Sequence, residues 1–384
     1  MSREIRIALI GYKFMGRAHS LGYKAMPLFF DNEVKPVMKV ICGRDEAAVT
    51  HQAERYGWEN VETDWRRTVS RNDIDLVDIC TPIDSHRDIA LSAAKAGKAI
   101  FCEKPLAKDL EEAQQMLNTV EQSKVPHFLA CTFRTVPAVI LAKQLVEEGE
   151  LGEIFHWTGH WLSDWALDPQ HPLEWRLQKT VSGYGALSDI GSHVVDLSRY
   201  TIGAKAGKIE SVTGALETYI KTRPLTAGSP KRGKVEVDDA AVFLSRFENG
   251  ALGSFALSRV AAGNKDRFFF EINGSKGSVI FDYANMNELR FYSNTDSPRL
   301  RGFRTIRVGN ELHPYGTRWG GTGVEGHGNG YADLFVFQAY ELMRNLAGDR
   351  RLLATFHDGV VAQAIFEAVA QSAAEKHWIQ VKAS

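Results

Sequence analysis

The sequence predicts an α/β protein with two parts: an N-terminal doubly wound parallel sheet and a C-terminal α+β part with a large, open, mostly antiparallel sheet. Over the first third of the chain, apolar runs alternate with helix-like stretches, and Asn-Gly pairs between apolar runs follow later. The 384 residues exceed what one hydrophobic core usually holds. Two domains are therefore expected, at residues 1–136 and 137–384.

The first part is expected to contain parallel strands that are buried on both faces. Its apolar runs are hydrophobic on both side-chain parities, as such strands require. The runs are residues 5–10, 37–42, 76–80, 99–102 and 128–131. Helical stretches at residues 45–56 and 86–96 each precede a glycine, the usual stop at a helix C-terminus. Strand and helix in alternation predict right-handed crossovers within one sheet.

The pattern changes after Pro137. Asn249-Gly250 and Asn273-Gly274 separate apolar runs, which is a strong hairpin signal. The expected elements are a helix at 137–148, strands at 241–247, 268–272 and 278–283, and closing helices at 331–346 and 356–375. A surface loop is expected at 222–234 and a long irregular excursion at 296–322.

The composition argues against several classes of protein. Lys and Arg total 46 against 47 for Asp and Glu, so no general attraction to nucleic acid or to an anionic membrane is expected. No apolar run approaches the ~20 residues that cross a bilayer, and no signal peptide is expected ahead of the first strand. The cysteines form no CxxC pair, so we expect no metal site and a reducing, cytoplasmic location. They are Cys42, Cys80, Cys102 and Cys131.

The first strand leads into a glycine turn that is typical of Rossmann dinucleotide-binding domains. Gly11 and Gly16 occupy the outer positions of a GxGxxG fingerprint, and Lys13 replaces the middle glycine. With Phe14 and Met15 between them, these residues would place the pyrophosphate on the N–H groups of the following helix, where the Lys13 ammonium can also reach it. The alternative is a purely structural glycine turn, which can follow any buried strand. The position of this turn after the first strand of a βαβ series favours the dinucleotide site.

The end of the second strand leaves the cofactor undecided between NAD and NADP. An acidic residue usually binds the adenosine ribose of NAD there, whereas this sequence has Gly43 and Arg44. These residues leave space and positive charge for a 2′-phosphate, which favours NADP. Alternatively, Arg44 stacks on the adenine, or Asp45 supplies the carboxylate.

Three further segments gather residues suited to catalysis. Thr81-Pro82-Ile83-Asp84-Ser85-His86 and Glu103-Lys104-Pro105 each follow a strand, where open α/β sheets bind ligands. Asp189 and His193 are spaced i, i+4 on one expected helix, so they would share a face suited to proton transfer. Taken singly, each residue has a structural explanation. Lys104 can be a solvated lysine at a strand end, Asp189 a carboxylate favoured by the helix dipole, and His193 a hydrogen-bonded core histidine.

Together these motifs resemble the Gfo/Idh/MocA oxidoreductases, the glucose–fructose oxidoreductase and inositol dehydrogenase family, over essentially the whole chain. The resemblance implies that His193 is the general base and that Lys104 donates a hydrogen bond to the same substrate oxygen. Asp189 would orient the substrate or share the proton. Lys13 and Gly43 depart from the family pattern.

The resemblance also implies further site residues and an assembly. A cis Lys104–Pro105 bond is expected, and Arg134 would close the cleft beneath the substrate. The cofactor would be lined by Thr81, Pro82, His86, Glu103 and Lys104. Closeness within the family favours NAD. Family members are dimers or tetramers through the open sheet, and an exposed apolar sheet face needs covering, so a homodimer or homotetramer is expected.

A tryptophan-rich stretch is the candidate for binding a carbohydrate. Aromatic rings stack on sugar C–H faces and Arg binds hydroxyls, so Trp165, Trp175 and Arg176 are expected to bind substrate alongside Lys104, Arg134, Asp189 and His193. Trp157, Trp161 and others can instead be core. Arg299, Arg301, Arg304 and Arg307 form a basic cluster that is either a solvated face or a site for an anionic group.

The predicted function is an NAD(P)-dependent dehydrogenase that oxidises a secondary ring hydroxyl of a sugar, glycoside or inositol by hydride transfer to nicotinamide. The alternative is an NAD-dependent, redox-neutral glycosidase that oxidises C3 transiently, eliminates the aglycone and adds water; the basic cluster would suit an anionic glycoside. A sensor without turnover is disfavoured, because a binding module does not need Lys104, Asp189 and His193 together.

Overall fold

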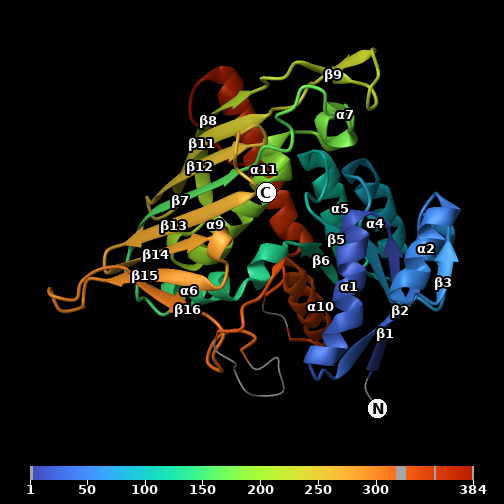
Figure 1. Ribbon diagram of the computed structural model, residues 1–384, viewed down its shortest axis with the longest axis horizontal. Coiled ribbons are helices and arrows are strands. Elements are labelled where there is room, and N and C mark those ends of the chain that lie inside the picture. The colour runs from blue at the N-terminus through green and yellow to red at the C-terminus, as the bar shows by residue number, and fades with distance from the viewer. Residues whose placement is uncertain (1–2, 317–325, 350–351, 383–384) are drawn as a thin grey trace. The chain divides into compact units, whose positions relative to one another are not determined.

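The computed structural model describes residues 3–316, 326–349 and 352–382 (Figure 1). These residues form two compact units, of which the first comprises the described residues within 3–135 and 329–360. The second comprises residues 136–316 and 361–382, with a short piece from 326 to 328. The second unit is therefore not one continuous run from residue 137, because helix α10 (Tyr331–Ala347) belongs to the first.

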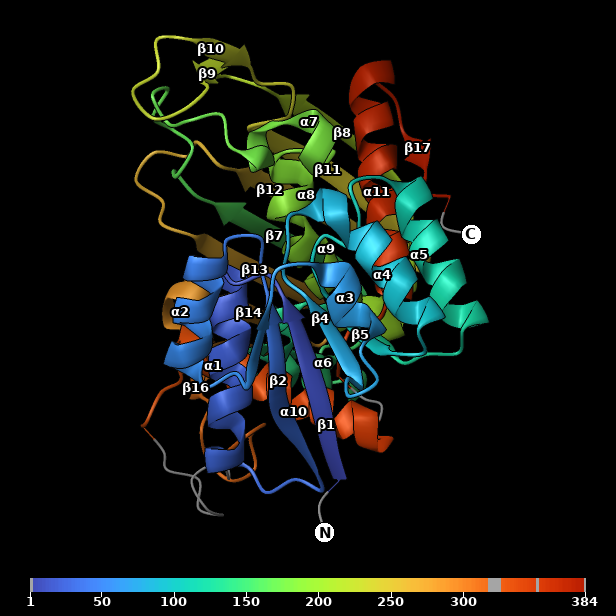
Figure 2. The ribbon, with the colours of Figure 1, turned by 90° about the vertical axis from the view of Figure 1, so that its right-hand side faces the viewer.

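The first unit is a parallel six-stranded sheet with the order β3-β2-β1-β4-β5-β6 (Figure 2). The strands are β1 (Arg3–Ile10), β2 (Val34–Cys42), β3 (Asn60–Glu62), β4 (Leu76–Ile79), β5 (Ala99–Glu103) and β6 (His127–Ala130). The five expected strands are confirmed. The edge strand β3 was not predicted, because its three residues are only half buried and carry no apolar run.

Helices cover both faces of this sheet, as a doubly wound fold requires. Alternate residues of β1 enter two separate cores: Ile7 and Leu9 pack with the helices α1, α2 and α10, and Ala8 and Ile10 with α3, α4 and α5. The helices are α1 (Phe14–Phe29), α2 (Glu46–Tyr56), α3 (Trp65–Ser70), α4 (His86–Lys95) and α5 (Leu110–Gln122).

The second unit contains a nine-stranded sheet with the order β16-β15-β14-β13-β7-β12-β11-β8-β17 (Figure 1). Neighbouring strands are antiparallel except β12 and β7. The strands are β7 (Ile154–Leu162), β8 (Ile209–Glu217), β11 (Ala240–Phe247), β12 (Leu252–Ser258), β13 (Arg267–Gly274), β14 (Gly277–Asp282), β15 (Glu288–Ser293), β16 (Arg304–Arg307) and β17 (Ile379–Gln380). Both expected hairpins, β11–β12 and β13–β14, are present, with Asn249-Gly250 between the strands of the first. In the second, Asn273-Gly274 are the last residues of β13, and Ser275-Lys276 separate the strands.

The two faces of this sheet differ in character. On the inner face, aromatic rings stack across neighbouring strands, with Phe243 and Phe255 4.3 Å apart and Trp157 5.1 Å from Phe255. Helices of the unit are α6 (Pro137–Glu147), α7 (Lys179–Ser182), α8 (Ala186–Asp189), α9 (Gly191–Ala206) and most of α11 (Phe356–Glu375). On the outer face, the side chains of Val242 and Leu244 remain exposed.

Two irregular stretches are more ordered than expected. The predicted loop at 222–234 is a two-stranded ribbon of β9 (Thr222–Pro224) and β10 (Arg232–Lys234). The predicted excursion at 296–322 contains β16, which pairs with β15, and its last residues lie outside the described part of the chain. In both places the strands are only three or four residues long, too short for a periodic pattern.

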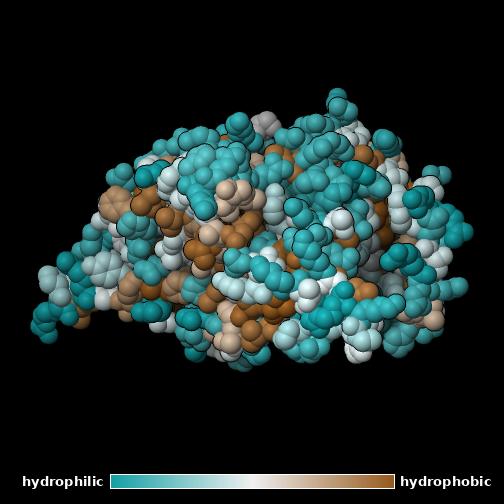
Figure 3. Space-filling view, turned by 90° about the horizontal axis from the view of Figure 1, so that it is seen from above, coloured by the Kyte–Doolittle hydropathy of each residue, from teal (hydrophilic) through white to brown (hydrophobic). Residues whose placement is uncertain are grey.

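The surface is largely polar on the face drawn in Figure 3, where hydrophobic residues form separate small patches among hydrophilic ones. Among the described residues, none of the helices is both long and apolar enough to span a bilayer.

Candidate functional site

The glycine turn after β1 packs tightly against neighbouring backbone. Gly11 has φ +113°, and a Cβ atom there would lie 2.5 Å from the Cys80 carbonyl oxygen. A Cβ at Gly16 would lie 2.0 Å from the Gly11 carbonyl oxygen. Lys13 is the N-cap of α1 and makes no side-chain capping bond, so the first N–H groups of the helix suit an anion such as a pyrophosphate.

The other two residues of the turn lie at the surface or near it. Phe14 is 64 % exposed and its ring stacks 6.4 Å from that of Tyr331 at the start of α10. Met15 is half buried in the first turn of α1.

The position of the usual ribose carboxylate is occupied by an aromatic ring. A Cβ atom at Gly43 would lie 2.1 Å from Cδ1 of Tyr12, so this ring fills the space of a side chain at the end of β2. Asp45 accepts a hydrogen bond from the Ala48 N–H at 3.0 Å and caps α2. Arg44 is exposed. The structure therefore shows a cation and a ring here, with Asp45 already engaged.

The turns after β4 and β5 are tied together by a buried histidine. His86 is 1 % exposed, and its Nε2 lies 2.9 Å from the Thr81 carbonyl oxygen while its Nδ1 lies 3.2 Å from that of Pro105. Burial lowers the pKa of His86, opposed by these carbonyls. The ring lies between the half-buried Thr81-Pro82 turn and the residues after Lys104, whose bond to Pro105 is cis as expected.

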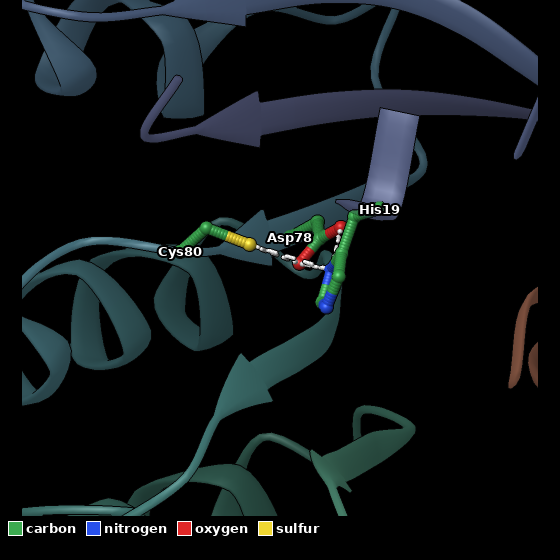
Figure 4. A group of neighbouring side chains, drawn as sticks. All are labelled: His19, Asp78 and Cys80. Atoms are coloured by element: carbon green, nitrogen blue, oxygen red, sulfur yellow. Dashed lines mark hydrogen bonds and ion pairs between the residues drawn. The ribbon is translucent and has the colours of Figure 1, made fainter. Parts of the chain in front are cut away.

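A buried polar network lies beneath this edge (Figure 4). Nδ1 of His19, on α1, lies 2.9 Å from Oδ2 of Asp78, and its Nε2 lies 3.1 Å from Oε1 of Glu103. Tyr23 donates a 2.7 Å hydrogen bond to Asp78. Burial is the largest single influence and lowers the pKa of His19, but the contacts with Asp78 and Cys80 together raise it above its ordinary value. Glu103, predicted to line the cofactor, is 5 % exposed and belongs to this network.

The same network includes the thiol of Cys80. Its sulfur lies 3.3 Å from Nδ1 of His19, and the ligand-type atoms of His19, Asp78 and Cys80 all lie within 4.8 Å of one another. Burial and the Asp78 charge raise the pKa of Cys80, which keeps the thiol protonated. His19, Asp78 and Cys80 therefore form one hydrogen-bonded cluster.

In the second unit, Asp189 and His193 come from two consecutive helices. α8 ends at Asp189 and α9 begins at Gly191, with Ile190 as the joint. The prediction of one continuous helix is therefore wrong. Gly191 packs so closely on β12 that a Cβ would lie 2.7 Å from Leu257, and glycine is a weak helix former.

The surroundings of Asp189 and His193 differ. His193 is 9 % exposed, and its ring stacks on that of Trp161, 5.0 Å away. The Asp189 side chain is 20 % exposed and lies 3.7 Å from Nη1 of Arg259, a fully buried residue. Sequence reasoning missed Arg259, because a single arginine after a strand looks like a solvated end.

The predicted substrate residues separate into two groups. Trp165, Trp175 and Arg176 are half buried in the second unit, with the Arg176 guanidinium 4.3 Å above the Trp175 ring. Trp157 is a core residue, as the alternative held. Arg134, in the first unit, is 7 % exposed and pairs with Asp358 at 3.3 Å.

The basic cluster is a solvated face. Arg304 pairs with Asp296 at 2.5 Å and Arg307 with Glu288 at 3.2 Å. Arg299 and Arg301 are exposed, and Arg301 donates to the Asp296 carbonyl oxygen at 3.2 Å. Carboxylates thus already neutralise part of this charge, which weakens the hypothesis of an anionic substrate.

Comparisons with known proteins agree along the whole chain. The family model described as "Oxidoreductase family, NAD-binding Rossmann fold" matches residues 5–130, and "GFO/IDH/MocA C-terminal domain" matches residues 139–280. Levoglucosan dehydrogenase of Pseudarthrobacter phenanthrenivorans is 39 % identical over 99 % of this chain and 98 % of its own. Myo-inositol 2-dehydrogenase of Thermotoga maritima is 27 % identical over 79 % of this chain and 81 % of its own.

Solved structures give the same result. A levoglucosan dehydrogenase in complex with NADH and levoglucosan superposes with a TM-score of 0.94, at 39 % identity and with all of both chains covered. An oxidoreductase domain protein from Kribbella flavida superposes with a TM-score of 0.93 at 43 % identity, covering 99 % of this chain and 100 % of its own.

Proposed function

Since the chain belongs to the Gfo/Idh/MocA oxidoreductase family, we propose that it is an NAD-dependent dehydrogenase of a neutral cyclic sugar, related to levoglucosan, and that it oxidises a secondary ring hydroxyl. The 39 % identity to levoglucosan dehydrogenase over nearly the full chain is the observation that carries this proposal. The half-buried rings of Trp165 and Trp175 support it, because aromatic faces suit sugar C–H groups. The glycosidase alternative is not favoured, since the named relatives are dehydrogenases and two of the four arginines in the basic cluster pair with carboxylates.

In the proposed mechanism, His193 takes the proton of the reacting hydroxyl as general base. The Trp161 ring fixes the plane of the imidazole. Lys104 donates a hydrogen bond to the same oxygen and favours its alkoxide, and Asp189 orients the substrate. Nicotinamide, when bound, accepts the hydride. The Gly11–Gly16 turn would hold its pyrophosphate on the start of α1, a place where added side chains would clash.

The test is absorbance at 340 nm with purified protein, NAD and a panel of levoglucosan, aldopyranoses, inositols and aryl glucosides, with released aglycone followed in parallel. We expect stoichiometric NADH with a sugar and no aglycone release. Lys104→Ala and His193→Ala should each lower kcat by at least ~10²-fold. Catalytic aglycone release without net NADH would instead establish the glycosidase, and unchanged turnover in both variants would overturn the catalytic assignment.

We further propose that NADP is accepted alongside NAD. The Tyr12 ring excludes an acidic side chain at Gly43, and Arg44 is exposed beside it, so nothing acidic at position 43 repels a 2′-phosphate. Arg44→Gln should lower kcat/KM for NADP by about 10-fold and leave NAD within about 2-fold. Arg55→Gln, an exposed arginine on α2, is the control and should change neither value. A wild-type protein that fails to turn over NADP contradicts the idea.

We also propose a homodimer or homotetramer that buries the outer face of the nine-stranded sheet, and a cytoplasmic location. Exposed Val242, Leu244 and Leu252 on neighbouring strands support the first. The four described cysteines are free thiols, which suits a reducing compartment.

A further inference from the structure

We propose that Arg259 is a positioning residue that holds the Asp189 carboxylate and the Trp165 and Arg176 segments in one arrangement around the substrate. The proposal rests on the proposed dehydrogenase function and deepens it. Arg259 comes directly after β12, and its side chain is fully buried.

The guanidinium of Arg259 contacts three predicted substrate residues at once. Nη1 lies 3.7 Å from Oδ2 of Asp189 and donates a 3.1 Å hydrogen bond to the carbonyl oxygen of Arg176. Its carbon Cζ lies 5.4 Å from the centre of the Trp165 ring. The main chain adds a fourth connection, because the Ala166 N–H donates to the Arg259 carbonyl oxygen at 3.0 Å.

The start of α8 is attached to the same point. Nη2 of Arg259 donates a 3.0 Å hydrogen bond to the carbonyl oxygen of Asp238. The Asp238 carboxylate accepts the N–H groups of Gly185 and Leu187, each at 2.7 Å. A Cβ at Gly185 would lie 2.7 Å from Nη2, so glycine is what allows the helix to begin here. The short helix α8, which ends at Asp189, is therefore held at its start by Asp238 and at its end by the contact of Asp189 with Arg259.

Charge explains why an arginine is placed in this core. A buried guanidinium is costly unless it is paired, and the two oxygens of Asp238 are taken by backbone N–H groups. Asp189 is the carboxylate at ion-pair distance from Arg259. At 3.7 Å the contact is an ion pair without a bidentate fork, so it places a cation beside Asp189 while the Asp189 side chain stays 20 % exposed.

Arg223 provides a matched control within the same unit. It is also fully buried and donates to main-chain carbonyl oxygens, those of Ala166 and Asp168. None of its described hydrogen bonds or ion pairs involves Asp189. Loss of either arginine removes a buried cation, but only loss of Arg259 should disturb Asp189.

The experiment is a double-mutant cycle on purified full-length protein with NAD and the best sugar. Arg259→Gln should lower kcat by at least ~10-fold and raise the sugar KM, with the NAD KM within ~2-fold, and Arg259→Lys should recover part of kcat. Arg223→Gln, assayed at the same fraction folded, should combine additively with Asp189→Asn, because its described hydrogen bonds do not involve Asp189. Added to Asp189→Asn, Arg259→Gln should cost clearly less than it costs in the wild type, because the contact between Arg259 and Asp189 is already lost.

A crystal structure of Arg259→Lys or Arg259→Gln gives a readout that does not depend on turnover. We expect the Asp189 carboxylate to move relative to α9. Fully additive losses for Arg259→Gln with Asp189→Asn, an equal departure from additivity for Arg223→Gln with Asp189→Asn, or an unmoved carboxylate would each overturn the positioning role. A wild-type protein that oxidises none of the sugars would refute the proposed function, and the crystal structure would still decide the role of Arg259.

Discussion

At the scale of single residues, His19 is the clearest case of a side chain whose charge is set by its surroundings. It lies between the carboxylates of Asp78 and Glu103, and all three side chains are buried. The Lys104 N–H donates to Oε2 of Glu103 at 3.1 Å, so the network extends to the backbone of the proposed catalytic lysine. An imidazolium here satisfies both carboxylates, because each ring nitrogen then donates a hydrogen bond.

This network predicts a pH dependence of stability. The folded-state pKa of His19 is raised above its ordinary value of 6.5. Its contribution to the free energy of unfolding is therefore complete below about pH 6.5 and is lost as pH rises through the folded-state pKa. Urea unfolding between about pH 6 and 9 should show wild-type stability declining toward the alkaline end, and His19→Gln should be less stable with a flatter profile.

Exposed His51, on α2, is the control for this measurement. His51→Gln should reproduce the wild-type profile. Equal pH profiles for wild type and His19→Gln would show that the pKa of His19 is not raised in the folded protein, which would contradict the imidazolium assigned to it.

At the scale of elements, local patterns predicted what local forces determine. The helix at residues 45–56 is confirmed as α2, with Asp45 as its cap and Gly57 in the left-handed region at φ +89°. The ribbon β9–β10 was missed because its strands are only three residues long, and the break at Ile190 was missed because it depends on the packing of Gly191 against Leu257 of β12. Short strands gain their order from pairing partners, which a periodicity along the chain does not reveal.

The candidate site shows the same division. Gly11, Lys104, Asp189 and His193 carry motif signals, so sequence alone could nominate them. The Tyr12 ring over Gly43 and the contacts of Arg259 could not be nominated, because each depends on residues brought together by tertiary structure. The side chains that shape a site therefore escape sequence reasoning more readily than those proposed to perform its chemistry.

At the scale of the whole molecule, the outer face of the nine-stranded sheet is the feature that a single chain leaves unexplained. Val242 is 57 % and Leu244 47 % exposed on β11, and Leu252 is 41 % exposed on β12. Across β11 and β12, Leu252 pairs with Arg246 and Ser254 pairs with Leu244. Side chains two residues apart on a strand point to the same face, so Leu244 and Leu252 lie on one face of the sheet. Contiguous exposed apolar surface on a sheet marks an interface, and an interface between identical chains is the commonest solution.

We therefore expect Val242→Lys with Leu244→Lys to dissociate the assembly, because opposing copies would place desolvated ammonium groups against each other. Light scattering after size exclusion should give the mass of one chain for this variant and a multiple of it for the wild type. Leu28→Lys, at an apolar position on α1 that is 81 % exposed, should leave the wild-type mass unchanged. A wild-type protein that is monomeric at micromolar concentration refutes the interface, and dissociation by Leu28→Lys as well would place it elsewhere.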